Sequence, residues 1–133
     1  MAAPLPQRIT LTLYTFSQRN PPTHLPHDPA LIIDCSLDRL PPPELCRQYT
    51  GLDREFQDNF VSQPGVQRKF QQHLALINSM LERWIRRKQG NKIAVGIMSE
   101  EGLHRSVAMA MALADSFVGR EGVIVPEPIH YSL

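Results

Sequence analysis

The chain has 133 residues, of which 42% are hydrophobic and 20% are charged, values that are ordinary for a soluble globular protein. This length predicts a single domain over residues 1–133, with a core over about 8–130, and allows a hydrophobic core without disulfides or metals. A formal net charge of +1 excludes a global attraction to nucleic acid or membranes, so either role would need a local patch.

The N-terminal third alternates predicted strands with proline-rich segments. Residues 8–16 alternate in hydrophobicity and are rich in β-branched side chains, which predicts a strand. Residues 20–29 contain four prolines and predict a loop. The apolar run 30–35 predicts a short buried strand that ends at Asp34. Residues 40–44 contain three consecutive prolines, which exclude a central strand or a helix interior there.

Two helices are predicted next, a short one over residues 53–60 and a long one over residues 66–88. Pro64 occupies a first-turn position of the long helix. Hydrophobic side chains recur there at helical spacing and predict one apolar face: Phe70, Leu74, Ile77, Leu81 and either Trp84 or Ile85. Gly90 and Asn91 end this helix.

The C-terminal part predicts a strand over residues 92–98, a helix over 104–117 and a last strand over 122–125. The helix has apolar or small side chains nearly all round, so we expect it to be buried against the sheet. Strands that alternate with helices imply right-handed crossovers and parallel pairing. We therefore predict an α/β fold, a single three-layer domain with a small, mainly parallel sheet flanked by helices.

The most informative segment is the loop from Ser99 to Ser106, which reads SEEGLHRS. A strand that turns through a glycine into a helix gathers free N–H groups at the positive end of the helix dipole. The spacing is that of the cysteine-phosphatase loop C-x-x-G-x-x-R-S, with Ser99 in place of the cysteine. The shape predicts capture of an anion, whereas the missing thiol argues against phosphatase chemistry.

Several residues around this loop have both a ligand-binding and a structural interpretation. In parallel sheets, ligands bind beyond the carboxyl ends of the strands, where Asp34, Ser99 and the segment after Val125 should meet. Arg105 could clamp an anion with its planar guanidinium, or pair with Glu100, Glu101 or Asp34. His104 could donate to a ligand or bond the backbone, and Ser99 could bind an anion or cap the turn.

The segment Thr50 to Asp53 (TGLD) could bring a hydroxyl and a carboxylate to the rim of the pocket. It could instead form a turn in which Asp53 caps the next helix. Histidines at positions 24, 27 and 130 and Asp28 fit no common zinc spacing, so we predict neither a metal nor a cofactor.

The end of the long helix is basic. It carries four cations beside Trp84: Arg83, Arg86, Arg87 and Lys88. Such residues could contact RNA phosphates while the indole stacks on a base. The alternative is that the cations balance the helix dipole and that Trp84 packs inward.

The segment from Tyr49 to Asp53 (YTGLD), followed by Gly102 to Val107 (GLHRSV), resembles the C-terminal domain of the RapZ family of P-loop-ATPase-associated proteins. The resemblance runs from about Ile9 to His130. It implies an α/β domain that binds glucosamine-6-phosphate and takes part in binding a small regulatory RNA. The chain contains no G-x-x-x-x-G-K-[ST] motif, so a nucleotide-binding domain is not expected in it, and a separate nucleotide-binding protein is a possible partner.

The chain also departs from the pattern of that family. The family loop reads roughly G-C-T-G-G-x-H-R-S, whereas this chain has a serine at position 99 and glutamates at 100 and 101. A D-x-R at the end of the second strand is here Asp34-Cys35-Ser36, and a C-terminal His-Arg is here His130-Tyr131. These changes remove positive charge or add negative charge where an anion should bind.

We therefore predict a non-catalytic, regulatory domain that senses a small anionic metabolite of the phosphorylated sugar class. The predicted ligand-binding residues are Asp34, Thr50, Asp53, Ser99, Gly102, His104, Arg105, Ser106 and His130. The alternative is an RNA-binding or protein-interaction module with a vestigial pocket. Nucleotide binding and a phosphatase-like enzyme are less favoured.

The cysteines and the N-terminus bear on the compartment. Cys35 and Cys46 form no framework, and as reduced thiols they are typical of an intracellular protein. Neither a signal peptide nor an apolar run of membrane-spanning length is recognisable. We expect an intracellular location, in the cytoplasm, and no membrane partner.

Overall fold

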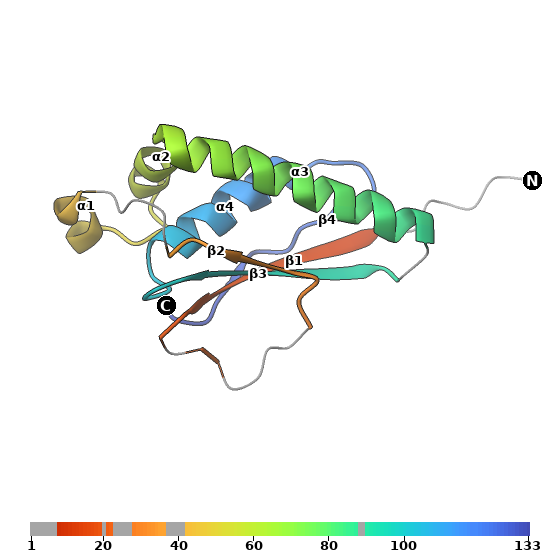
Figure 1. Cartoon of the computed structure of the whole chain (residues 1–133), viewed down its shortest axis with the longest axis horizontal. Helices are drawn as coiled ribbons and strands as arrows, with labels where there is room; N and C mark the ends of the chain where they lie inside the picture. The colour runs from red at the N-terminus through yellow and green to blue at the C-terminus, as the bar shows by residue number, and fades with distance from the viewer. Residues whose placement is uncertain (1–7, 20, 23–27, 37–41, 88–89) are drawn as a thin grey trace, which may run out of the picture.

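The computed structural model describes residues 8–19, 21–22, 28–36, 42–87 and 90–133. Its elements follow in the order β1 (Ile9–Ser17), β2 (Leu31–Asp34), α1 (Pro43–Gln48), α2 (Arg54–Ser62), α3 (Pro64–Arg87), β3 (Lys92–Ser99), α4 (Arg105–Phe117), β4 (Val123–Ile124) and β5 (Ile129–His130). Figure 1 shows the helices over a twisted sheet, which confirms the α/β class.

The sheet has the order β2-β3-β1-β4, and β5 also pairs with β1. Every one of these pairings is parallel, so the predicted parallel sheet is confirmed. β4 pairs with the start of β1 and β5 with its end, and Pro126 and Pro128 stand between them. Because proline has no N–H to donate, the C-terminal segment forms two short strands instead of one long one. β5 was not predicted.

The main hydrophobic core lies between the sheet and the helices. α4 contacts β1 and β3 directly, and α2 and α3 pack against α4. Most of α4 is buried, as its composition predicts. In Figure 1 the helices lie on one side of the sheet, so they flank it on one face only. On the other face, Tyr14, Phe16 and Ala94 form a small second core, with Met98 packed against it.

α3 presents one apolar face to this core. Ile77 and Leu81 are fully buried, and Phe70, Leu74 and Trp84 are half-buried against the core. Ile85 is 58% exposed, so Trp84 and not Ile85 completes the predicted face.

α1 was not predicted, and it begins at the last of the three consecutive prolines, which therefore lie outside a helix interior as expected. Pro43 is its first residue, and Pro42 precedes it as the N-cap. A proline at the first helical position is compatible with a helix because its missing N–H would have no partner within the helix.

Among the residues that the structure describes, no helix is both long and apolar enough to cross a membrane.

Candidate functional site

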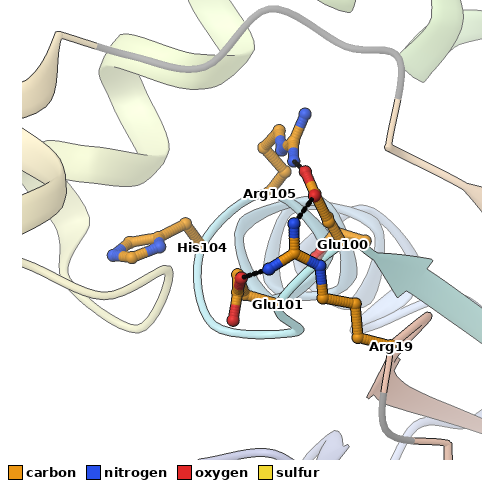
Figure 2. Close-up of a pocket in the computed structure, with 6 residues that line it drawn as sticks. Arg19, Glu100, Glu101, His104 and Arg105 are labelled. Carbon is orange, nitrogen blue, oxygen red and sulfur yellow. Dashed lines mark hydrogen bonds and ion pairs between the residues drawn. The ribbon is translucent and has the colours of Figure 1, made fainter.

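The carboxyl ends of three neighbouring strands meet at one edge of the sheet. Ser17 at the end of β1 is paired with Ser99 at the end of β3, and Asp34 at the end of β2 is paired with Met98. A pocket of about 250 Å³ lies at this edge, and Figure 2 shows its lining residues: Arg19, Ser99, Glu100, Glu101, His104 and Arg105. Three of the predicted ligand-binding residues, Ser99, His104 and Arg105, therefore line the pocket.

The loop from β3 to α4 is fixed by buried hydroxyl groups. The Ser99 and Ser106 side-chain oxygens are 2.8 Å apart, and the Gly102 N–H donates to Ser99 Oγ at 3.2 Å. Gly102 has a φ of +74°, and a Cβ there would lie 2.8 Å from the Ser17 backbone nitrogen. Only glycine fits such a backbone position without strain. Ser99 and Ser106 thus stabilise the loop through these hydrogen bonds, in agreement with the capping interpretation of Ser99.

Arg105 is the buried cation of the site. Its side chain starts from the first residue of α4, and the residue is only 7% exposed. Nη1 donates to the Ser36 carbonyl oxygen at 2.7 Å, and Nη2 lies 3.9 Å from Glu100 Oε2. The Asp34 carboxylate accepts the Ser36 N–H at 2.8 Å, so Asp34 and Arg105 both fasten the turn that follows β2.

Arg19 joins the two glutamates of the loop. Its Nη1 donates to Glu101 Oε1 at 2.8 Å, and its Nη2 forms an ion pair with Glu100 Oε1. In Figure 2 the Glu100 carboxylate lies between the guanidinium groups of Arg19 and Arg105. Arg19 was not among the predicted site residues. Its position two residues after the first strand was the only available signal, because ligands of parallel sheets bind beyond the carboxyl ends of the strands.

His104 connects the pocket with α1 and α2. Its Nε2 lies 2.9 Å from the Cys46 carbonyl oxygen, and its ring centroid lies 5.2 Å from that of Phe56. Because a carbonyl only accepts, Nε2 carries the proton of this hydrogen bond. The backbone interpretation of His104 therefore holds for Nε2, while the residue still lines the pocket.

Thr50, Gly51 and Asp53 form a turn that supports the loop from outside the pocket. The Asp53 carboxylate accepts the Thr50 N–H at 2.8 Å, and the Gly51 N–H donates to the Leu103 carbonyl oxygen at 3.1 Å. Asp53 occupies the N-cap position of α2, but its side chain makes no capping hydrogen bond to that helix. The structure thus places Thr50 and Asp53 next to the β3–α4 loop and not in the pocket lining.

His130 lies on β5, beside Thr15 of β1. Its Nδ1 is 2.8 Å from the Thr15 hydroxyl oxygen, and its Nε2 is buried without a hydrogen-bond partner among the described atoms. Burial lowers the pKa of His130 below its ordinary value, and Glu127 opposes this only in part. His130 is therefore partly buried beside β1 and does not line the pocket.

The basic end of α3 lies far from the pocket. Arg83, Arg86 and Arg87 are exposed, whereas Trp84 packs against the core and is not presented to a base. α3 ends near the start of β3, at the opposite end of the sheet from the Ser99 loop (Figure 1). Lys88 lies outside the described residues, as do the histidines at positions 24 and 27.

Comparison with known proteins agrees with the family resemblance that the sequence motifs indicate. Residues 8–126 match the RapZ C-terminal domain family. A protein named nucleotide-binding protein from Parafrankia sp. (strain EAN1pec) is 35% identical over 114 residues, which cover 83% of this chain and 37% of that protein. A second protein of that name, from Frankia alni, is 36% identical over 110 residues, which cover 80% of this chain and 36% of the relative. The chain thus spans little more than a third of these relatives.

Proposed function

Because the chain belongs to the RapZ C-terminal domain family, we propose that the pocket at the β3–α4 loop binds a small metabolite of the amino-sugar phosphate class. Binding would serve regulation and not catalysis. The observation that carries this proposal is the buried Arg105, which lines the pocket from the first turn of α4.

The surroundings of Arg105 favour a phosphate group. The first N–H groups of a helix have no acceptor within the helix, and the helix dipole adds positive potential at that end. A guanidinium binds phosphate oxygens in a bidentate manner. Drug-sized ligands occupy pockets of roughly 300–1,000 Å³, so a pocket of about 250 Å³ favours a small metabolite.

The contacts of the loop favour binding over catalysis. A serine nucleophile needs an adjacent general base. The Ser99 hydroxyl instead contacts the Ser106 hydroxyl and the Gly102 N–H. The Nε2 of His104, the imidazole of the pocket lining, donates its hydrogen bond to the Cys46 carbonyl oxygen.

The test is a titration with glucosamine-6-phosphate, followed by calorimetry and by thermal unfolding. The ligand should raise the melting temperature of the wild type, and Arg105→Ala should abolish both the binding heat and the shift. Arg105→Lys keeps the charge but loses the bidentate geometry, so it should bind more weakly while it remains folded. Arg54→Ala is the control, since Arg54 is exposed on α2 and pairs with Asp58.

Two results would contradict the proposal. One is the absence of any binding heat or thermal shift with the wild type. The other is an unchanged shift in Arg105→Ala, provided that circular dichroism shows this variant to be folded.

RNA contact at the end of α3 is the second candidate function. It is favoured by three exposed arginines in the last two turns of the helix, Arg83, Arg86 and Arg87, and by the exposed Lys92 at the start of β3. These side chains could contact phosphates. Stacking of Trp84 on a base is not part of this proposal, because its ring packs against the core.

A further inference from the structure

Glu100 occupies the position between the two arginines of the pocket. One of its carboxylate oxygens pairs with Arg19, and the other lies 3.9 Å from Arg105 Nη2. Glu101 pairs with the second amino group of Arg19 at 2.8 Å. Figure 2 shows the resulting row of groups from Arg105 through Glu100 and Arg19 to Glu101. Its charges alternate in sign, and the formal charges of two arginines and two glutamates cancel.

This cancellation changes which ligands the pocket can accept. A plain phosphate ester that reached Arg105 would lie next to the Glu100 carboxylate. The repulsion between these like charges would offset the attraction to Arg105. A ligand that carries an ammonium group beside its phosphate avoids this repulsion, because the ammonium group can pair with a carboxylate.

We infer that Glu100 and Glu101 are specificity-determining residues that select zwitterionic ligands, with a cation and a phosphate close together, over plain phosphate esters. This inference rests on the proposed function and adds to it the reason for selecting an amino group. Arg19 is a positioning residue, because it pairs with both carboxylates.

The exposure of the row allows the exchange that such binding requires. The side chains of Arg19, Glu100 and Glu101 are 62%, 45% and 58% exposed. Exposed ion pairs are weak and open readily. Arg105 is buried, with one guanidinium nitrogen bonded to the Ser36 carbonyl. Upon binding, the phosphate would pair with Arg105, and the ligand ammonium would replace the Arg19 guanidinium against Glu100, while Arg19 keeps its pair with Glu101. Each of the four side chains would then have a partner of opposite charge.

The experiment compares three ligands by calorimetry below neutral pH, where the sugar amine is protonated. They are glucosamine-6-phosphate, glucose-6-phosphate and glucosamine. We expect the wild type to prefer glucosamine-6-phosphate over glucose-6-phosphate by about tenfold, the preference that one or two weak ion pairs supply. Glucosamine should bind least, since it lacks the phosphate that Arg105 takes.

The decisive variant is the double substitution Glu100→Gln and Glu101→Gln. It should weaken binding of glucosamine-6-phosphate and strengthen binding of glucose-6-phosphate, so that the preference falls toward onefold. Glu82→Gln is the matched control, because Glu82 is exposed on α3 outside the pocket, and it should leave the preference unchanged.

The outcomes separate this inference from the proposed function. If the wild type binds both sugar phosphates equally, or if the double variant retains the preference, Glu100 and Glu101 do not determine specificity, and the proposed function still stands. If the wild type binds none of the three ligands, the proposed function fails, and this inference fails with it.

Discussion

Gly51 lies so close to the start of α4 that a side chain at this position would overlap the His104 backbone. A Cβ on Gly51 would lie 2.4 Å from the His104 carbonyl oxygen and 2.5 Å from the Ala108 nitrogen. The Gly51 N–H also donates to the Leu103 carbonyl oxygen at 3.1 Å. This contact ties the turn before α2 to the loop that carries Arg105, so the geometry of the pocket depends on a glycine outside its lining.

Gly51→Ala should therefore destabilise the protein and disturb the pocket. Backbone atoms cannot move aside as a flexible side chain can, so we expect a loss of roughly 2–3 kcal/mol in the free energy of unfolding, as for other overpacked sites. Urea denaturation measures this loss. Gly65→Ala is the control, because nothing lies within 4 Å of its added Cβ. It should stabilise α3 by about 0.5 kcal/mol. Equal effects of the two substitutions would contradict the packing argument.

Much of the fold and part of the site could be predicted from the sequence because they depend on local patterns. The alternation in residues 8–16 predicts β1, and the apolar composition of α4 predicts its burial. β5 has only two residues beside prolines, so it has no recognisable period, and it forms because Ile129 and His130 pair with Tyr14 and Thr15.

Arg19 could not be assigned to the site from local patterns. It is 81 positions away from Glu100 in the sequence, and they meet because the parallel register places Ser17 beside Ser99. Arg105, in contrast, could be predicted, since its place in the loop motif fixes its position at the start of α4. The orientation of Glu100 and Glu101 depends on Arg19, so it could not be predicted from the sequence either.

Tyr14 should make the stability of the protein sensitive to alkaline pH. Burial, with smaller effects of Tyr131 and Asp28, raises the pKa of its phenol from 10.0 to about 12. The folded state therefore keeps a proton that the unfolded state loses. This contribution to stability is fully present below pH 10 and falls as the pH rises toward about 12, by on the order of 2–3 kcal/mol for a shift of this size.

Denaturant midpoints between pH 9 and about 11.5, where the shift predicts most of the loss, test this effect against Tyr14→Phe. The phenylalanine variant should lose less stability over this range. It should also be as stable as the wild type or more stable at neutral pH, because the Tyr14 hydroxyl is buried without a hydrogen-bond partner in the described part of the chain. Parallel pH profiles of the two proteins would refute the assignment to Tyr14.

His130 should make the stability of the protein sensitive to acidic pH. Burial lowers its pKa below the ordinary 6.5, so the unfolded state takes up a proton that the folded state does not. Its contribution to stability is present above pH 6.5 and is lost as the pH falls through the lower pKa of the folded state. In His130→Asn, whose amide can still bond the Thr15 hydroxyl, melting temperatures between neutral pH and pH 5 should decline less than in the wild type. An equal decline would show that other groups dominate.

The exposed arginines of α3 give a separate prediction about RNA. If they contact phosphates, binding of a single-stranded RNA should weaken steeply with added salt. The double substitution Arg86→Gln and Arg87→Gln should then reduce the slope of log K against log [salt] by about 1.4, from about 0.7 for each lost contact. Arg54→Gln, on α2, should leave the slope unchanged. A wild type that binds no RNA at low salt would remove this candidate function.

Ser99→Cys tests whether the loop retains phosphatase geometry once a thiol is present. Ser99 is 2% exposed, and the next residue is Glu100, whose carboxylate faces the same pocket. Burial and a neighbouring negative charge both raise the pKa of a thiol, so the new cysteine should remain protonated and unreactive near neutral pH. We expect no hydrolysis of p-nitrophenyl phosphate by this variant, and alkylation by iodoacetamide no faster than that of Cys35 and Cys46 in the wild type. If hydrolysis appeared, the N–H groups at the start of α4 would outweigh the charge of Glu100, and a plain phosphate ester would have access to the pocket after all.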